Sequence, residues 1–261
     1  MLHQIDWQLL GERLFEPAGP FWRALVTTVG VAVVAQIVGV ILGFLVVMSL
    51  RTRFWPLKVV TYLYVWVFRG TPIVVQIFFV FFGANLFLGF DLFPREVSLI
   101  GFTISGAVVA GTVALAVNEG AYMSEIIRAG IEAIDRGQLE SALAVGMLRR
   151  TAMRRIILPQ AARVIIPPLG NQFNYMLKTT SLLAFIGVYE LFRDAQVHYS
   201  VHFQPVEVFI AVAIWYLTLT TIWGLVQVRL ERRFGASELD ENESWLTRLL
   251  GLGGSADRGR R

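Results

Sequence analysis

Long apolar stretches alternate with short polar segments along most of the chain, and this alternation predicts membrane-spanning helices. About 20 apolar residues are needed to cross a hydrocarbon core roughly 30 Å thick. The first such stretch, Ala24–Leu50, contains no charged residue. With the four that follow it, we expect five spans, at Ala24–Leu50, Val59–Leu88, Leu99–Val117, Ala161–Val188 and Val206–Val228. The predicted fold class is therefore an all-α membrane protein.

Basic residues mark which polar segments face the cytoplasm. The connections within 51–58 and 128–163 and the segment beginning at Arg229 are rich in Arg and Lys. The alternate segments, 85–98 and 189–205, each contain one Arg among acidic residues. This alternation predicts an N-terminus outside and a C-terminus in the cytoplasm. We expect an extracytoplasmic arm (residues 1–21), a transmembrane domain (22–232) with a cytoplasmic loop (136–160), and a cytoplasmic polar tail (233–261).

Composition agrees with this assignment and excludes several other classes of protein. The chain of 261 residues is 56% hydrophobic and 16% charged, whereas soluble domains average about 45–50% and about 25%. It has no cysteine, which excludes disulfides, thiol catalysis and Cys-ligated zinc, and its three histidines argue against a histidine-rich metal site. The net charge is +4, but the basic residues punctuate the apolar stretches instead of forming one face. We therefore expect a lipid bilayer and no nucleic acid as its surroundings.

Charged and helix-breaking residues interrupt the second predicted span. An Arg at the centre of a membrane helix costs about 2.5–3.5 kcal/mol on insertion scales, so it usually faces a cavity or a partner. Arg69 is followed by Gly70, Thr71 and Pro72, and this sequence predicts a break in the helix. We interpret Arg69 as part of a cationic lining for an anionic group. The alternative is that it reaches a lipid headgroup or packs against a neighbouring helix.

The fourth predicted span has a similar pattern. Pro167, Pro168 and Gly170 are expected to break the helix. The polar residues that follow share one helical face by their spacing of three and four, namely Asn171, Asn174, Lys178 and Ser181. Hydrogen bonding between helices would explain Ser and Thr there, but it explains Lys178 poorly. Because broken helices at a midplane site recur in transporters, two broken spans favour a solvated path.

The basic loop between the third and fourth spans predicts a helix–turn–helix on the cytoplasmic face. Its first half, Glu140–Val145, contains small residues that favour a helix, and Gly146 allows a turn. Four arginines follow within Met147–Arg155. Exposed small and apolar residues suit a peg in a groove of another protein. Binding of lipid headgroups is an equally good interpretation of this loop.

Several motifs resemble one family of membrane proteins. Glu140-Ser-Ala-x-x-x-Gly146, followed by Ile156-x-Leu158-Pro159, resembles the EAA loop of ABC importer permeases, with Ser141 at a position that is typically Ala. Other segments are similar to the polar amino acid permease subfamily, namely Phe68–Gln76, Ala121–Ile131, Gly170–Phe173, Lys178–Leu182 and Ile186–Leu191. The resemblance covers roughly residues 20 to 235 and follows the same order along the chain.

This resemblance implies a permease subunit of the cytoplasmic membrane that pairs with a second copy or a paralogue. It also implies a cytoplasmic ABC ATPase dimer docked on the EAA loops and an extracytoplasmic amino-acid-binding protein. The chain has no phosphate-binding loop before Lys178, so we expect no enzyme activity and no bound cofactor, with ATP and Mg²⁺ held by the partner ATPase. The residues expected to couple to that ATPase are Glu140, Ser141, Ala142, Gly146, Arg149, Ile156, Leu158 and Pro159.

The same resemblance suggests which residues contact an amino acid substrate. It points to Arg69, Thr71, Asn171 and Gln172. With the neighbouring Gly70 and the polar-face residues Lys178 and Ser181, these are the expected substrate contacts. Hydrogen bonding between helices is an equally good interpretation of Gln172. A carboxylate at position 172 would favour cationic amino acids, so the neutral Gln172 weakens an arginine- or lysine-type substrate without excluding it. The competing function is a stand-alone channel or secondary carrier for a small polar solute. That function would explain Arg69 and Lys178, but it gives the loop at 136–160 no role.

Overall fold

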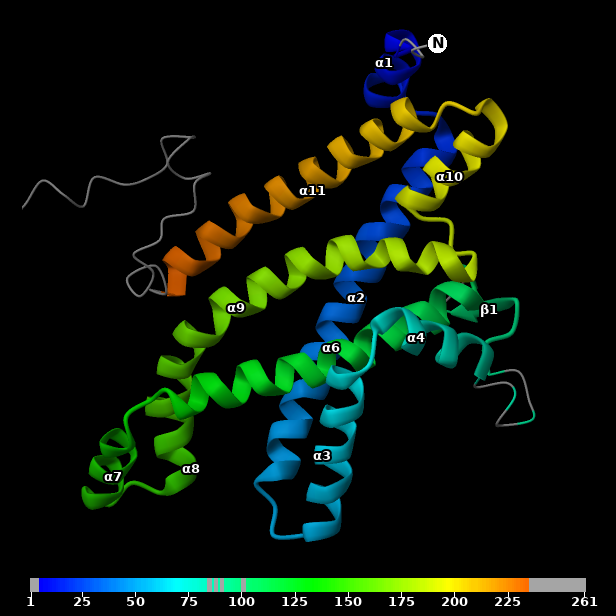
Figure 1. Cartoon of the computed structure of the whole chain (residues 1–261). Coiled ribbons are helices and arrows are strands. Elements are labelled where there is room, and N and C mark those ends of the chain that lie inside the picture. Colours follow the sequence, from blue (N-terminus) through cyan, green and yellow to red (C-terminus); the bar gives the residue numbers. More distant parts are fainter. Residues whose placement is uncertain (1–4, 84–85, 87–88, 90–91, 100–101, 235–261) are drawn as a thin grey trace, which may run out of the picture.

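The computed structural model describes residues 5–234, except 84–85, 87–88, 90–91 and 100–101. The expected polar tail at 233–261 lies outside the described residues, apart from its first two positions. Almost all of the described chain is helical (Figure 1). The helices are α1 (Trp7–Phe15), α2 (Gly19–Leu50), α3 (Trp55–Gly70), α4 (Ile73–Phe78), the π-helix η1 (Phe79–Gly83), α6 (Gly106–Glu132), α7 (Arg136–Ala144), α8 (Arg149–Ala152), the π-helix η2 (Met153–Ile157), α9 (Leu158–Thr179), the 3₁₀-helix η3 (Thr180–Ile186), α10 (Leu191–His202) and α11 (Pro205–Phe234).

Length and hydropathy single out two described helices as able to cross a membrane, and a bent pair as a third candidate. α2 and α11 are each long and apolar enough to cross a membrane. α3 and the segment Ile73–Gly83 are long and apolar enough only when taken together, and a bend of 113° separates them. The break expected at Arg69–Pro72 is therefore present. α6 and α9 occupy the places of the third and fourth predicted spans, but a total of five crossings remains a prediction.

The third predicted span begins later than expected, and the chain is not entirely α-helical. Two short strands, β1 (Glu96–Leu99) and β2 (Phe102–Ser105), pair in antiparallel orientation before this span. The sequence Phe102–Ser105 alternates apolar with polar residues, a period that suits a strand. Ser105 then caps α6, because its Oγ accepts a hydrogen bond of 3.3 Å from the Ala107 amide. The expected start near Leu99 is therefore wrong. The helix continues to Glu132, beyond Val117, where the apolar stretch of the expected span ends.

The expected break of the fourth span at Pro167 and Pro168 is also wrong. α9 continues through both prolines to Thr179. Side chains of α11 contact α9 there: Gln227 Nε2 donates to the Pro167 oxygen (3.4 Å) and Trp223 Nε1 to the Gly170 oxygen (2.8 Å). Prolines are tolerated inside membrane helices that neighbouring helices support, and α11 packs against α9 along this stretch. The chain instead changes direction after η3, at Gly187, whose φ is +84°.

The core lies where α2 crosses α6 and α9 (Figure 1). Small residues allow α2 and α6 to approach closely. A Cβ atom at Gly39 would lie 2.5 Å from Glu119 Cγ, and one at Gly43 would lie 2.6 Å from Met123 Cβ. Buried apolar side chains from α2, α4, α6, α9 and η3 extend this core on one side. The helix crossing therefore sets the positions of the polar side chains described below.

Glu190 fixes the start of α10. Its carboxylate accepts hydrogen bonds from the amides of Phe192 (3.0 Å) and Arg193 (2.7 Å) and from the Tyr216 hydroxyl (2.8 Å). Burial raises the pKa of this carboxyl, against the lowering effect of these hydrogen bonds. Because Glu190 is 1% exposed, its place in the Ile186–Leu191 motif has a structural explanation: it caps α10 and joins it to α11.

Candidate functional site

The break between α3 and α4 is held by two buried amides. Gln76 Nε2 donates to the carbonyl oxygens of Phe68 (3.0 Å) and Thr71 (3.1 Å) and to Thr71 Oγ1 (2.8 Å). Asn118 Nδ2, from α6, donates to the same Phe68 oxygen (3.0 Å) and to Gln76 Oε1 (2.9 Å). These bonds satisfy carbonyl groups that lost their helical partners, which is required at membrane depth. The break is therefore stabilised by side chains of the chain itself.

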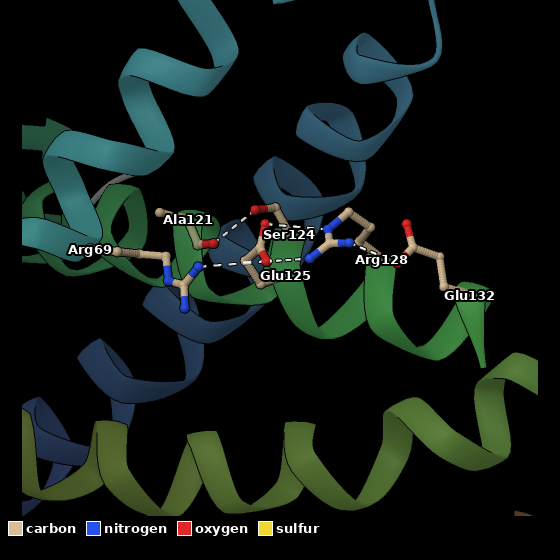
Figure 2. Close-up of polar contacts among 6 residues, drawn as sticks. All are labelled: Arg69, Ala121, Ser124, Glu125, Arg128 and Glu132. Carbon is tan, nitrogen blue, oxygen red and sulfur yellow. Dashed lines mark hydrogen bonds and ion pairs between the residues drawn. The ribbon is translucent and has the colours of Figure 1, made fainter.

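Arg69 lies beside an acidic residue of α6. Its Nη1 is 3.5 Å from Glu125 Oε2, and its guanidinium lies 5.6 Å from the centre of the Tyr122 ring. Figure 2 shows that Arg128 shares the Glu125 carboxylate (2.7 Å) and also pairs with Glu132 (2.7 Å). Arg69 thus contacts a neighbouring helix, as the alternative interpretation of its position required. Its side chain is still 43% exposed, so a second anionic group can reach it.

The other expected substrate contacts around the break are accessible in this chain. Gly70 and Thr71 are both exposed. A Cβ atom at Gly70 would meet nothing within 4 Å. The Thr71 hydroxyl donates to the Val67 oxygen (2.8 Å) while it accepts from Gln76. This arrangement leaves an open surface next to Arg69.

The expected polar stripe on α9 divides into exposed and half-buried residues. Asn171 and Lys178 are exposed, and Asn171 Oδ1 accepts from Gln227 Nε2 (3.2 Å). Ser181 lies in η3, where its hydroxyl donates to the Lys178 oxygen (2.7 Å). Gln172 is half-buried and points towards α6, whereas Asn171 contacts Gln227 of α11. Of the expected contacts on α9, Gln172 is the one that reaches the core.

Gln172 leads to a buried residue that the sequence reasoning missed. Its Nε2 donates to Glu119 Oε2 (3.0 Å), and Gln36 Nε2, from α2, donates to Glu119 Oε1 (3.0 Å). Glu119 is 1% exposed and lies at the midpoint of α6. It lies two residues past Val117, where the apolar stretch of the expected third span ends, and the sequence analysis assigned it no role. An acidic residue at the end of an apolar stretch is the signal that could have identified it.

The side chains at the α3–α4 break and those of α9 contact α6 at different positions along the helix. Arg69 reaches Glu125, whereas Gln172 reaches Glu119. Among the described residues, no hydrogen bond or ion pair joins Arg69 to Gln172 directly. That part of the chain also contains no group of three or more His, Asp or Glu residues suited to a metal ion. The shared element is therefore α6, which carries both carboxylates.

The loop between α6 and α9 has the expected helix–turn–helix shape. α7 ends at Ala144, and Gly146 adopts a φ of +82° before α8 begins at Arg149. In this turn the Met147 amide donates to the Ala142 oxygen (3.0 Å). Two apolar side chains protrude from it, with Val145 78% and Leu148 76% exposed. The loop lies at one end of the molecule, far from α1 and α10 (Figure 1).

The structure places the expected coupling residues on both faces of this loop. Ala142 is buried and Ile156 is half-buried. The remaining expected residues are exposed, namely Glu140, Ser141, Gly146, Arg149, Leu158 and Pro159. Ile156 packs against buried residues of α2, α6 and α9 and so holds the loop in place. The exposed ones form a surface, together with Val145 and Leu148, that is available to another protein.

Comparison with known proteins gives several relatives over most of the chain. The chain is 39% identical over 213 residues to the arginine transport system permease protein ArgU of Corynebacterium glutamicum, covering 81% of this chain and 67% of that protein. It is 35% identical over 231 residues to the glutamine transport system permease protein GlnP of Escherichia coli K12, covering 88% and 98%. A crystal structure of an amino acid ABC transporter with histidines matches with a TM-score of 0.71 and 36% identity, covering 82% of this chain and 94% of that one.

A more distant structure shares the fold alone. It is the MetNI methionine ABC transporter in an inward-facing conformation, with a TM-score of 0.66 and 16% identity over 84% of this chain. A family model of transport proteins matches residues 25–236, which include α2 to α11 except the first six residues of α2. The chain therefore belongs to the family of binding-protein-dependent transport system inner membrane components, as a helical permease of the cytoplasmic membrane.

Proposed function

We propose that this chain is the permease subunit of an ATP-binding cassette importer that carries polar amino acids across the cytoplasmic membrane. Family membership supports the transport role. Relatives named as arginine and glutamine permeases support the substrate class. In this proposal the chain provides the path and hydrolyses nothing itself. ATP and Mg²⁺ are bound by a separate ATPase dimer, and an extracytoplasmic binding protein delivers the amino acid.

The observation that carries the proposal is the exposed surface of the α7–α8 loop. Val145 and Leu148 are more than three-quarters exposed at the tip of an ordered turn. Exposed apolar side chains on such a projection favour insertion into a groove of another protein. A stand-alone channel or carrier would have no use for this surface. We therefore assign it to the ATPase, with Glu140 and Arg149 contributing polar contacts at its rim.

The remaining parts follow from this assignment. The loop then faces the cytoplasm, the arm at residues 1–21 lies outside, and five crossings separate the two termini. The substrate path runs along exposed and half-buried residues of the α3–α4 break, α9 and η3, namely Arg69, Gly70, Thr71, Asn171, Gln172, Lys178 and Ser181. A second copy of the chain or a paralogue closes the other side of this path.

The uptake of labelled amino acids by cells with and without the gene tests the proposal. We expect the uptake of at least one polar amino acid to depend on the gene and to be lost in the Leu148→Asp variant. Leu148→Asp should also abolish copurification of the ATPase, because it places a charge on the docking surface. Val201→Asp, at a 64% exposed position on α10, is the matched control and should retain the ATPase. Unchanged uptake of every amino acid in cells without the gene would contradict the proposal.

A further inference from the structure

An acidic side chain lies buried where three helices cross, and none of the described Arg or Lys side chains forms an ion pair with it. Glu119 of α6 is 1% exposed, and its two oxygens each accept one hydrogen bond, from Gln36 of α2 and Gln172 of α9. The ion pairs among the described residues do not include it. A buried carboxylate that lacks a positive partner is costly, and within a membrane such residues usually serve a function.

A second buried group beside this carboxylate also lacks a partner. Gln36 is 6% exposed, and its Oε1 accepts no hydrogen bond from any residue that the structure describes. Its Nε2 donates to Glu119 (3.0 Å), so the free amide oxygen belongs to the same side chain that contacts the carboxylate. Buried acceptors are almost always satisfied in folded proteins. The site therefore has more acceptor capacity than the chain's own donors use.

The acceptors have the chemistry of a site for a positively charged nitrogen group. Each carboxylate oxygen can accept about two hydrogen bonds, whereas an ammonium or guanidinium group offers only donors. Charge-assisted hydrogen bonds of this kind are roughly twice as strong as neutral ones. A cationic nitrogen at this position would satisfy Gln36 Oε1 and would neutralise Glu119. The described residues offer no other group that does both.

The structure also indicates the direction from which such a group would enter. Of the two amides that contact Glu119, Gln36 of α2 is buried and Gln172 of α9 is half-buried. Gly39 of α2 is in close contact with the Glu119 side chain. A group that approaches the carboxylate from the solvent-accessible side therefore meets Gln172 first and has to displace its amide.

We propose that Glu119, with Gln36 and Gln172, forms a subsite for the cationic nitrogen group of the amino acid substrate. This inference rests on the proposed function. The cationic group has two possible sources, the α-ammonium that every amino acid carries and the charged side chain of a basic amino acid. The neutral Gln172 does not determine charge selectivity by itself, because the Glu119 carboxylate lies 3.0 Å from its amide nitrogen.

The test uses the complete transporter, reconstituted with its ATPase and binding protein, in the wild type and as Glu119→Gln. The substitution removes the charge and keeps the shape. Uptake of L-arginine, L-citrulline and L-glutamine is measured as KM and kcat, because citrulline resembles arginine without its side-chain charge. We expect Glu119→Gln to raise KM by at least about tenfold for the substrates whose cationic group it binds.

The pattern across the probes identifies the source of the cationic group. A loss for arginine alone supports binding of the side-chain cation, and a similar loss for all transported probes supports binding of the α-ammonium. Glu132→Gln, which removes an exposed carboxylate at the end of the same helix, is the control and should leave KM unchanged. An unchanged KM for every transported probe in Glu119→Gln would overturn the inference and leave the proposed function intact.

A second variant and a direct binding measurement guard against misfolding. Gln36→Met removes the unpartnered acceptor and fills the same space, and we expect it to raise KM less than Glu119→Gln does. Thermal stabilisation of the detergent-purified transporter by each probe at a saturating concentration reports binding without transport. Wild-type protein that none of the three probes stabilises would also overturn the inference. The uptake of labelled amino acids by cells with and without the gene would then test the proposed function separately.

Discussion

The guanidinium of Arg69, at the end of α3, lies 3.5 Å from the carboxylate of Glu125 on α6. This contact ties the break between α3 and α4 to the helix that also carries Glu119. Arg128 binds the same carboxylate at 2.7 Å, so Glu125 remains paired even without Arg69. Arg69 therefore lies near the exposed break, and its ion pair with Glu125 leaves part of its side chain accessible.

Removal of Arg69 is expected to impair transport more than stability. Exposed ion pairs contribute about 0.2–1 kcal/mol, and the Arg69 side chain is 43% exposed. We predict that Arg69→Ala lowers uptake at least about tenfold and leaves the melting temperature of the purified complex nearly unchanged. Arg69→Lys should retain part of the uptake, because it keeps the charge. Wild-type uptake by Arg69→Ala would show that Arg69 does not line the path.

The amide of Gln76 is expected to be important for stability. It is a donor to the Thr71 oxygen and the acceptor of Asn118 Nδ2, whereas the Phe68 oxygen also has Asn118 as a donor. A buried polar group left without a partner costs about 1–3 kcal/mol. We predict that Gln76→Leu lowers the thermal stability of the purified protein clearly. Gln8→Leu, on the exposed side of α1, is the matched control. Equal melting temperatures for the two variants would mean that other groups satisfy the break.

Two glycines of α2 offer a test of the helix crossing. A Cβ atom at Gly43 would lie 2.6 Å from Met123 Cβ and 2.8 Å from the Ser124 amide nitrogen, whereas one at Gly30 would meet nothing within 4 Å. Overpacking of a core typically costs about 1–3 kcal/mol. We predict that Gly43→Ala destabilises the protein, while Gly30→Ala is neutral or slightly stabilising because it removes a helical glycine. Thermal unfolding in detergent measures both, and a more severe effect at Gly30 would contradict the described packing.

Gly146 is expected to determine how transport is coupled to ATP hydrolysis. Its φ of +82° is unfavourable for other residues by about 1–2 kcal/mol. We predict that Gly146→Ala lowers the substrate-stimulated ATPase activity of the assembled transporter, because the α7–α8 loop is misplaced. Gly11→Ala, in the interior of α1 with open space around it, is the control. Full stimulation in Gly146→Ala would show that this turn does not need its left-handed backbone.

Features that depend on local sequence were predictable. The charged, glycine- and proline-containing segment at Arg69–Pro72 predicts a helix break, and the structure contains one. Gly146 between two helix-forming segments predicts the turn of the cytoplasmic loop. In both places the backbone conformation follows from the residue itself.

Features that depend on a neighbouring helix were not predictable in this way. Pro167 and Pro168 suggest a break, but α9 is continuous and packs there against Trp223 and Gln227 of α11. Glu119 ends an apolar stretch in the sequence, yet α2 and α9 enclose it in the fold. Neither outcome can be read from one segment, because each depends on which helices cross.

ATP-driven accumulation in proteoliposomes tests the central claim most directly. The chain is reconstituted with its copurified ATPase and binding protein, and labelled L-arginine or L-glutamine is supplied on the side of the binding protein. We predict accumulation against a gradient with ATP and Mg²⁺ on the opposite side, and none with a non-hydrolysable ATP analogue. Equilibration of the amino acid by the chain alone, without ATP or ATPase, would contradict the account and identify a channel or carrier.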